Sequence, residues 1–138
     1  MAGFLGQFDH SIDAKGRLIL PQKFRKIFEK QAYLTQHREG CLALWTPSEF
    51  ERQLAEMRQE QKLDKAHRNR VRIWSAASTD VDIDAQGRIA IPTYLRTFAR
   101  LDGKVLVNGA IDRVEIWSPA VWEERVQPEE GWFFEDDE

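Results

Sequence analysis

The sequence predicts an α+β fold in which one small β-rich module occurs twice, flanked and linked by helices. Residues 12–21 recur as residues 83–92, with Ile, Asp, Ala, Gly, Arg and Pro at identical positions. In both copies a polar turn with a glycine separates short apolar runs, a pattern typical of two strands around a tight connection. A proline then begins a stretch with apolar residues at helical spacing. This order, repeated 71 residues further along the chain, indicates two pseudo-symmetric modules.

Each module continues with two more strands after its first helix. In the first copy Phe24, Ile27 and Phe28 share one helical face, and strands are expected at 32–35 and 41–45. The equivalent positions of the second copy are Leu95, Phe98 and Ala99 for the helix, and 105–107 and 113–117 for the strands. Modules of fewer than roughly 60 residues bury too little surface to be stable alone. The two modules must therefore share a core or pair with other chains.

Two helices are expected to link the modules. Thr46 and Glu49 form a capping box around Pro47, which predicts the start of the first linking helix. A second helix, rich in Lys and Arg, is expected at about 63–75. In the second copy the helix that matches the first one lacks the reciprocal glutamate, because Val121 stands in its place.

These elements divide the chain into two modules, a linker and a tail. The expected boundaries are 7–54 for the first module, 55–77 for the helical linker, 78–124 for the second module and 127–138 for an acidic tail. We expect the tail to lack regular structure, although its aromatic residues at 132–134 are suited to docking on an apolar surface.

Charge is distributed unevenly, although the formal net charge of the chain is only −3. Residues 123–138 contain eight acidic residues and one basic residue, a local charge of −7. The other residues contain 19 basic and 15 acidic residues, a charge of +4. A basic body suits a nucleic-acid partner, and an acidic tail repels DNA or screens a basic face. The alternative is that this charge run is solvated surface without a partner.

Composition favours a cytoplasmic protein. No apolar run approaches the roughly 20 residues needed to cross a bilayer, so no membrane partner is expected. The first residues lack the basic and long apolar regions of a signal peptide. Cys41 is the only cysteine, which excludes an intrachain disulfide and suits a reducing compartment. We expect Cys41 to be a buried strand residue, because small thiols are among the most buried side chains.

The sequence does not favour an enzyme, a metal site or a cofactor site. The three histidines, at positions 10, 37 and 67, are scattered and show no metal-ligand spacing. Asp9, His10 and Ser11 are neighbours on an expected strand and face alternate sides of it, which prevents them from forming a catalytic triad. No glycine-rich phosphate-binding motif occurs in the sequence.

The repeated turn has residues that shape it. Gly16 and Gly87 adopt a positive φ at little cost, as tight turns require. Asp13 and Asp84 are placed to accept hydrogen bonds from backbone N–H groups within the same turn. The two turns are therefore expected to have the same conformation.

The candidate ligand-binding residues are the cations beside these turns. Arg17 and Arg88 each follow the turn glycine and precede an apolar strand. A guanidinium group forms paired hydrogen bonds with guanine edges or with phosphates. Lys15 adds a point charge in the first turn. The alternative is that both arginines are surface residues or partners of Asp13 and Asp84.

These motifs resemble those of the MraZ family of transcription regulators. The resemblance covers nearly the whole chain to about residue 126, and the doubled Asp-x-x-Gly-Arg motif is highly specific in a chain of this length. It rests on residues 4–6, 13–17 with 20–21, 84–88 with 91–92, and 115–117.

The resemblance implies two AbrB-like (SpoVT-AbrB) swapped-hairpin modules that form a β-barrel-like unit flanked by helices. It also implies a ring-like homo-oligomer, associated with the nucleoid, that binds short double-stranded repeats in the promoter of the bacterial division and cell-wall gene cluster, usually as a repressor. The family's DNA contacts carry over to Arg17, Arg88 and Lys15. Gln86 replaces a lysine-like residue in the second turn, so the two turns are expected to contribute unequally.

One alternative from a different class stays open at this point. A ring-forming interaction protein, acting as a scaffold without specific DNA readout, would share the repeat and the turns. The salt dependence of DNA binding separates the two functions, because counterion release makes DNA affinity fall steeply as salt rises.

Overall fold

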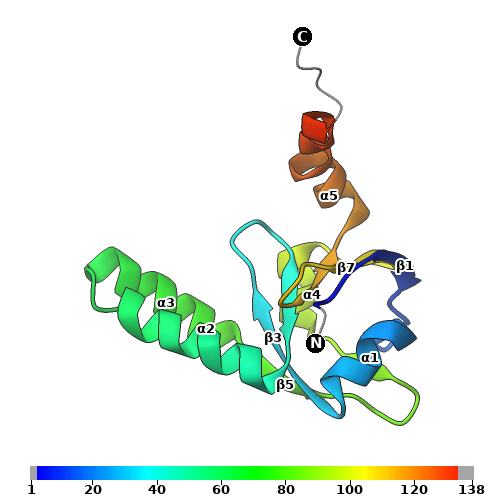
Figure 1. Cartoon of the computed structure of the whole chain (residues 1–138), viewed down its shortest axis with the longest axis horizontal. Coiled ribbons are helices and arrows are strands. Elements are labelled where there is room, and N and C mark those ends of the chain that lie inside the picture. Colours follow the sequence, from blue (N-terminus) through cyan, green and yellow to red (C-terminus); the bar gives the residue numbers. More distant parts are fainter. Residues whose placement is uncertain (1–2, 134–138) are drawn as a thin grey trace.

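The computed structural model describes residues 3–133, which contain eight strands, five α-helices and one 3₁₀-helix (Figure 1). In chain order they are β1 (Gln7–Ser11), β2 (Arg17–Ile19), α1 (Gln22–Phe28), β3 (Gln31–Gln36), β4 (Leu42–Trp45), α2 (Pro47–Glu60), α3 (Lys65–Ala77), β5 (Thr79–Asp82), β6 (Arg88–Ala90), α4 (Thr93–Ala99), β7 (Lys104–Gly109), β8 (Val114–Trp117), α5 (Pro119–Arg125) and η1 (Gln127–Phe133). The predicted α+β class and the predicted order of elements in the two repeats are confirmed.

The strands form one six-stranded antiparallel sheet, in the order β1-β7-β8-β4-β3-β5, and one two-stranded ribbon of β2 and β6. Both arrangements have pseudo-two-fold symmetry. At the centre of the sheet Ala43 lies opposite Glu115, its counterpart in the second copy. At the centre of the ribbon Leu18 lies opposite its counterpart Ile89. One axis therefore relates the two repeats in both sheets.

The two repeats exchange their first strands. β1 of the first copy pairs with β7 of the second, with Gln7 opposite Asn108. β5 of the second copy pairs with β3 of the first, with Gln31 opposite Asp82. Each repeat therefore completes the other's part of the sheet. Between residues 3 and 133 the hydrogen-bonded strands do not close into one continuous barrel, the form that the family resemblance implied.

The central strands β4, β7 and β8 are buried on both faces of the sheet. Along β7, Val107 packs into the main core, whereas Leu106 on the other face packs against α5. Along β4, Leu44 belongs to the main core and Trp45 packs under α2. This explains why the central strands are continuous apolar runs rather than alternating ones. The inner face is covered by the ribbon, α1 and α4, and the outer face by α2, α3 and α5.

Local signals explain where the linking helices begin. Thr46 caps α2, since its hydroxyl accepts a hydrogen bond from the Glu49 N–H at 3.2 Å. Asp64 caps α3 by accepting from the His67 N–H at 2.8 Å, so α3 begins at Lys65, two residues later than predicted. The Ser118 side chain makes no capping hydrogen bond to α5.

The C-terminal segment differs from the prediction as far as it is described. Residues 127–133 form η1, although we expected no regular structure there; Pro128 supplies a helical φ in its first turn. The side chains of Trp132 and Phe133 are exposed rather than docked on this chain. Phe134 and the acidic residues after it lie outside the described residues. No helix in the described part is both long and apolar enough to span a membrane.

Candidate nucleic-acid interface

The two Asp-x-x-Gly-Arg loops have the same hydrogen bonds. In the first, one carboxylate oxygen of Asp13 accepts from the N–H groups of Lys15 and Arg17, each at 2.9 Å. In the second, Asp84 accepts from Gln86 at 2.9 Å and from Arg88 at 2.8 Å. In each loop the bond from the arginine N–H is the main cause that holds the pKa of the aspartate below its ordinary value. Ionised aspartates thus close both loops.

Each loop glycine meets an arginine from the other repeat. Gly16 and Gly87 have φ values of 80° and 81°, in the left-handed region that favours glycine. A Cβ atom on Gly16 would lie 2.8 Å from the Cζ atom of Arg96 on α4. A Cβ atom on Gly87 would overlap the guanidinium group of Arg25 on α1. Glycine is therefore needed for its backbone conformation and for the close approach of a guanidinium group.

Each loop arginine forms an ion pair with the aspartate of its own loop and is still partly exposed. Arg17 donates from Nε to Asp13 at 2.8 Å, and Arg88 donates to Asp84 at the same distance. The exposed fractions of the two arginine side chains are 33% and 26%. Among the described residues, no hydrogen bond involves the Nη groups of these arginines. Pairing with aspartate thus orients each guanidinium group and leaves its terminal edge available to a ligand.

The ribbon places both arginines on one face. Leu18 and Ile89 point into the core, so the residues on either side of them point outward. Arg17 lies opposite Ala90, and Arg88 lies opposite Ile19. The two arginines are therefore diagonal neighbours, whose spacing in antiparallel ribbons is roughly 7–8 Å. A two-stranded ribbon with two outward guanidinium groups is a shape suited to a DNA groove.

The third predicted site residue makes the two loops unequal. Lys15 is exposed at the tip of the first loop, and Gln86 is exposed at the same place in the second. Among the described residues, the Lys15 side chain forms no ion pair. The first loop thus presents one positive charge more than the second.

Sequence reasoning missed the roles of Arg25 and Arg96, which flank the loops. Arg96 donates to the carbonyl of Ile91 and to the hydroxyl of Thr93, each at 2.9 Å. Arg25 crosses to the other repeat and donates to the carbonyl of Gln86 at 3.2 Å. The sequence does contain a signal for these roles, because Arg25 and Arg96 occupy the same position in the two repeats. In the first copy Gln22 stands at the position of Thr93, so Arg25 has no equivalent hydroxyl group to donate to.

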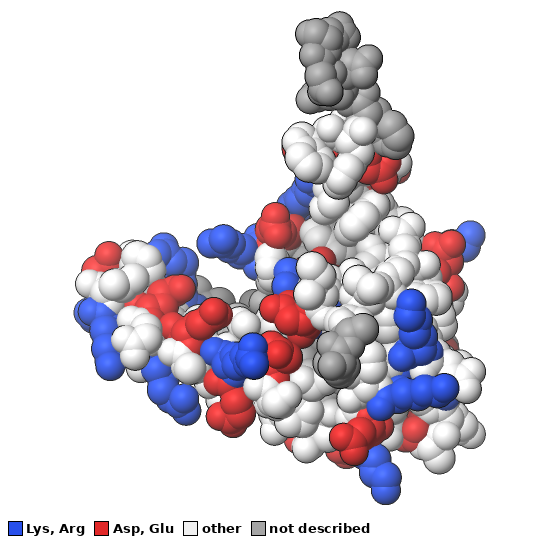
Figure 2. Space-filling model, in the orientation of Figure 1, with Lys and Arg blue, Asp and Glu red and all other residues white. Residues whose placement is uncertain are grey.

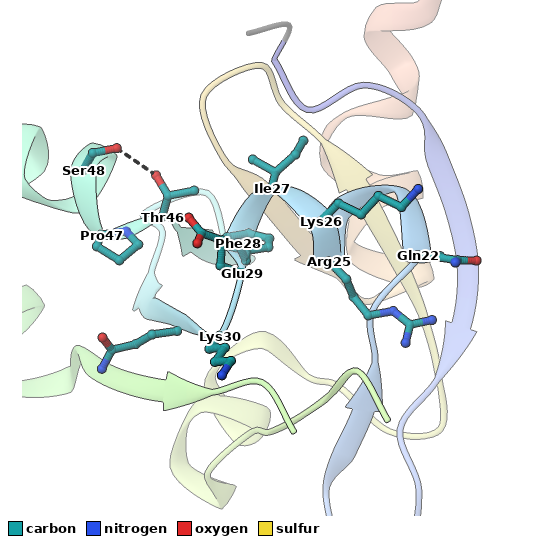
Figure 3. A pocket seen from close by; sticks show the side chains of 11 residues that line it. Gln22, Arg25, Lys26, Ile27, Phe28, Glu29, Lys30, Thr46, Pro47 and Ser48 are labelled. Atoms are coloured by element: carbon teal, nitrogen blue, oxygen red, sulfur yellow. Dashed lines mark hydrogen bonds between the residues drawn. The ribbon is translucent and has the colours of Figure 1, made fainter. Parts of the chain in front are cut away.

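A cavity of about 880 Å³ lies beside the N-terminal module, between α1 and the start of α2 (Figure 3). Lys26 extends from α1 on one side of it, and the hydroxyl groups of Thr46 and Ser48 lie 3.4 Å apart on the other. Basic side chains gather over α1 on the face shown in Figure 2. Among the described residues, the lining holds no histidine or cysteine to place an imidazole base beside a nucleophile.

The residues that an enzyme would need are separated or engaged elsewhere. Asp13 and Asp84 form their hydrogen bonds within their own loops. Burial lowers the pKa of His37 and raises the pKa of Cys41, so both side chains are favoured in their uncharged forms. Between residues 3 and 133, no group of histidine, cysteine and acidic side chains is arranged to hold a metal ion.

Comparison with known proteins identifies relatives over most of the chain. The family model described as "MraZ protein, putative antitoxin-like" matches residues 4–73 and 75–138, so its two parts correspond to the two repeats. "Transcriptional regulator MraZ" of Kocuria rhizophila is 39% identical over 135 residues, which cover 98% of this chain and 94% of the relative. The protein of the same description from Ligilactobacillus salivarius is 42% identical over 120 residues, 87% of this chain and 84% of the relative. A third, from Pediococcus pentosaceus, is 39% identical over 130 residues, 92% and 89% of the two chains.

Proposed function

This chain belongs to the MraZ family of transcriptional regulators, which is not a family of enzymes, and we propose that it is a sequence-specific DNA-binding repressor that acts as a ring-like homo-oligomer. Its targets are short repeats of double-stranded DNA in the promoter of the bacterial division and cell-wall gene cluster. The protein acts in the cytoplasm, on the nucleoid, and needs no cofactor. Its repeats belong to the AbrB-like swapped-hairpin type, which the exchange of β1 and β5 supports.

The observation that carries this proposal is the shared outward face of Arg17 and Arg88 on the β2–β6 ribbon. The major groove of B-DNA, roughly 12 Å wide, admits a two-stranded ribbon. Each guanidinium group, oriented by its aspartate, is placed to form paired hydrogen bonds with a guanine edge or a phosphate. Lys15 adds a phosphate contact beside the first loop.

Several ribbons in one oligomer bind several DNA repeats at once. Each ribbon makes only a few contacts, so a single one binds weakly. Linking them in one assembly raises the overall affinity, because every binding event after the first is intramolecular. Occupied promoter repeats then block transcription.

The double variant Arg17→Ala with Arg88→Ala tests the DNA contacts. We expect each lost paired contact to weaken binding of promoter DNA by about 1–3 kcal/mol in a gel-shift titration. Arg52→Ala, which removes an exposed arginine on α2, is the matched control and should bind as the unmodified protein does. Unchanged affinity in the double variant contradicts the assignment of these residues.

The scaffold function is tested in the same titration. A DNA-binding protein that neutralises several phosphates loses affinity steeply as salt rises, with a slope of roughly −0.9 per phosphate on logarithmic axes. Binding that is weak, independent of sequence and almost flat with salt favours the scaffold instead.

A further inference from the structure

Two helical arms extend from the outer face of the sheet and bury little of their own surface (Figure 1). The first is the hairpin of α2 and α3, in which α3 has no buried residue and α2 has only Phe50. The second is the C-terminal arm of α5 and η1, in which every residue of η1 is exposed. Helices in globular proteins bury one face against a partner. Both arms are therefore incomplete in a single chain.

The arms differ in charge. The hairpin, residues 47–77, contains seven basic and five acidic residues, and its surplus of positive charge lies on α3. α3 contains four basic residues and no acidic residue. Within residues 3–133, none of its lysine or arginine side chains forms an ion pair. The C-terminal arm, residues 119–133, contains four acidic residues and one basic residue, and the sequence continues with four more acidic residues. Opposite charges of this kind attract and orient two surfaces.

Each arm also presents exposed apolar side chains. On η1, Trp132 is 68% exposed and Phe133 is 75% exposed, with their rings packed edge to face at 4.4 Å. On α3, Ile73 is 64% exposed and borders a groove of about 630 Å³. The other large apolar side chains that line the groove are Trp45, Met57, Trp74 and Phe98. Tryptophan and phenylalanine bury roughly 150–250 Å² each when they enter such a site.

Comparison of the two repeats shows that different segments follow their equivalent helices α2 and α5. α5 occupies the place of α2 in the second copy, but the helix that follows α2, the basic α3, has no counterpart after α5. The C-terminal arm instead ends in the exposed aromatic pair. Figure 1 shows the α2–α3 hairpin extending to the left and the C-terminal arm toward the top, and no residue of α5 or η1 is among the described residues that line the groove.

We propose that the C-terminal arm of one copy docks on the α3 groove of a second copy. Trp132 and Phe133 fill the groove, and the acidic side chains of the arm face the cations of α3. This contact rests on the self-association in the proposed function and specifies its interface. Because the two surfaces differ, the contact is head-to-tail, and repeated contacts of this kind close into a ring or extend as a filament.

A segment of protein fits this groove better than DNA does. The groove is lined by three basic residues, Arg38, Arg70 and Arg113, and by three acidic ones, Glu56, Glu60 and Asp112. Its walls are thus close to neutral, which suits apolar side chains and offers little attraction to a phosphate backbone. The groove also lies toward the outer face of the sheet, whereas the ribbon with Arg17 covers the inner face.

Two variants of the full chain each remove one side of the contact. Trp132→Ala with Phe133→Ala removes the docking segment, and Arg70→Glu with Ile73→Asp removes the groove. We expect both to sediment as monomers at concentrations where the unmodified protein is oligomeric. The loss is at least about 30-fold in affinity for each aromatic, as for residues that dominate an interface. Leu5→Ser, which removes an exposed apolar side chain outside both arms, should leave the mass unchanged.

Mixing the two variants tests the direction of the contact. Each retains the surface that the other lacks, so an equimolar mixture should form a one-to-one dimer by native mass spectrometry and grow no further. Unchanged circular dichroism spectra and melting temperatures establish that both variants are folded. A mixture that stays monomeric contradicts the head-to-tail contact.

The remaining outcomes separate this inference from the function proposed above. If the unmodified protein is oligomeric and both variants keep its mass, this interface is wrong while self-association stands. If the unmodified protein is itself a monomer, self-association and the interface both fail. If Arg70→Glu with Ile73→Asp keeps its mass but loses promoter binding, α3 contacts DNA and the interface is wrong.

Discussion

The two repeats are nearly identical where they meet and different where they end. At the pseudo-two-fold axis, Leu18 and Ile89 face each other, and both loops are closed by the same hydrogen bonds from backbone N–H groups to Asp13 and Asp84. Away from the axis, the first repeat continues into a basic hairpin and the second into an acidic arm. The shared interior thus preserves one outward-facing ribbon with Arg17 and Arg88, while the divergent ends give the molecule one basic and one acidic arm.

The largest expected effect lies at the axis. Leu18→Ala and Ile89→Ala each remove a fully buried side chain of the shared core. Each should cost about 2–5 kcal/mol of unfolding free energy, measured by chemical denaturation. Because the two residues occupy equivalent places, their costs should agree within about 1 kcal/mol. A clearly larger difference would show that the repeats are not equivalent even at their centre.

The next largest effect is a difference in stability between variants of the two arginines that flank the loops. Arg96→Ala removes two hydrogen bonds at 2.9 Å and should destabilise the fold by about 1–2 kcal/mol. Arg25→Ala removes one bond at 3.2 Å and should cost less than about 1 kcal/mol. Thermal melting of the two variants side by side measures the difference, and equal losses would remove the asymmetry that we assign to Gln22 and Thr93.

A smaller effect is expected at the two helix starts that follow the central strands. Thr46→Ala deletes the capping hydrogen bond of α2 and should cost about 1 kcal/mol. Ser118→Ala deletes a hydroxyl that makes no such bond to α5 and should cost less than about 0.5 kcal/mol. Urea titrations resolve these values, and a greater loss at Ser118 than at Thr46 would reverse the expected order.

The charge difference between the loops predicts a change in the salt dependence of DNA binding. Lys15→Gln makes the first loop resemble the second and should reduce the salt slope by about 1, whereas Gln86→Lys should raise it by about 1. Affinity for promoter DNA measured across a range of salt concentrations tests both changes. Identical slopes in all three proteins mean that neither position contacts phosphate.

The smallest expected effect is on the pH dependence of folding stability, and it should be equal in the two repeats. The folded-state pKa of Asp13 and of Asp84 lies below the ordinary value of 3.8. Their ionised forms therefore support the loops fully above pH 3.8, and this support is lost as the pH falls further. Asp13→Asn and Asp84→Asn should each make stability less dependent on pH in that acidic range. Circular dichroism during acid titration measures it, and an effect in only one variant contradicts the equivalence of the loops.

Most of the local structure could be predicted from the sequence, because turns, helix caps and strands are specified by residues that lie close together in the chain. The repeat of residues 12–21, the turn glycines and the capping threonine all act within a few residues. The strands at 32–35 and 105–107 were recognised from their apolar runs and proved only slightly longer. The loop geometry around Asp13 followed from the hydrogen bonds that aspartate makes in turns.

The missed features depend on contacts between distant parts of the chain. β1 and β5 contain mostly polar residues, because each lies at an edge of the sheet with one side exposed. Their exchange between repeats cannot be read from periodicity, which does not specify a pairing partner. The contact between Arg25 and the opposite loop has the same origin, since Gln86 lies 61 positions after Arg25 in the sequence.

The pairing of Gln7 with Asn108 also constrains how a newly made chain folds. At roughly 5–20 residues per second, a ribosome needs several seconds after making β1 to complete β7. During that interval the nascent N-terminal half carries an unpaired strand, and β4 is open along the edge that β8 later covers. We expect ribosome-bound chains stalled before β7 to be cut rapidly by protease, and chains in which an added C-terminal linker carries β8 clear of the ribosome to be resistant. Equal resistance at both lengths would mean that the first half folds before its partner strands exist.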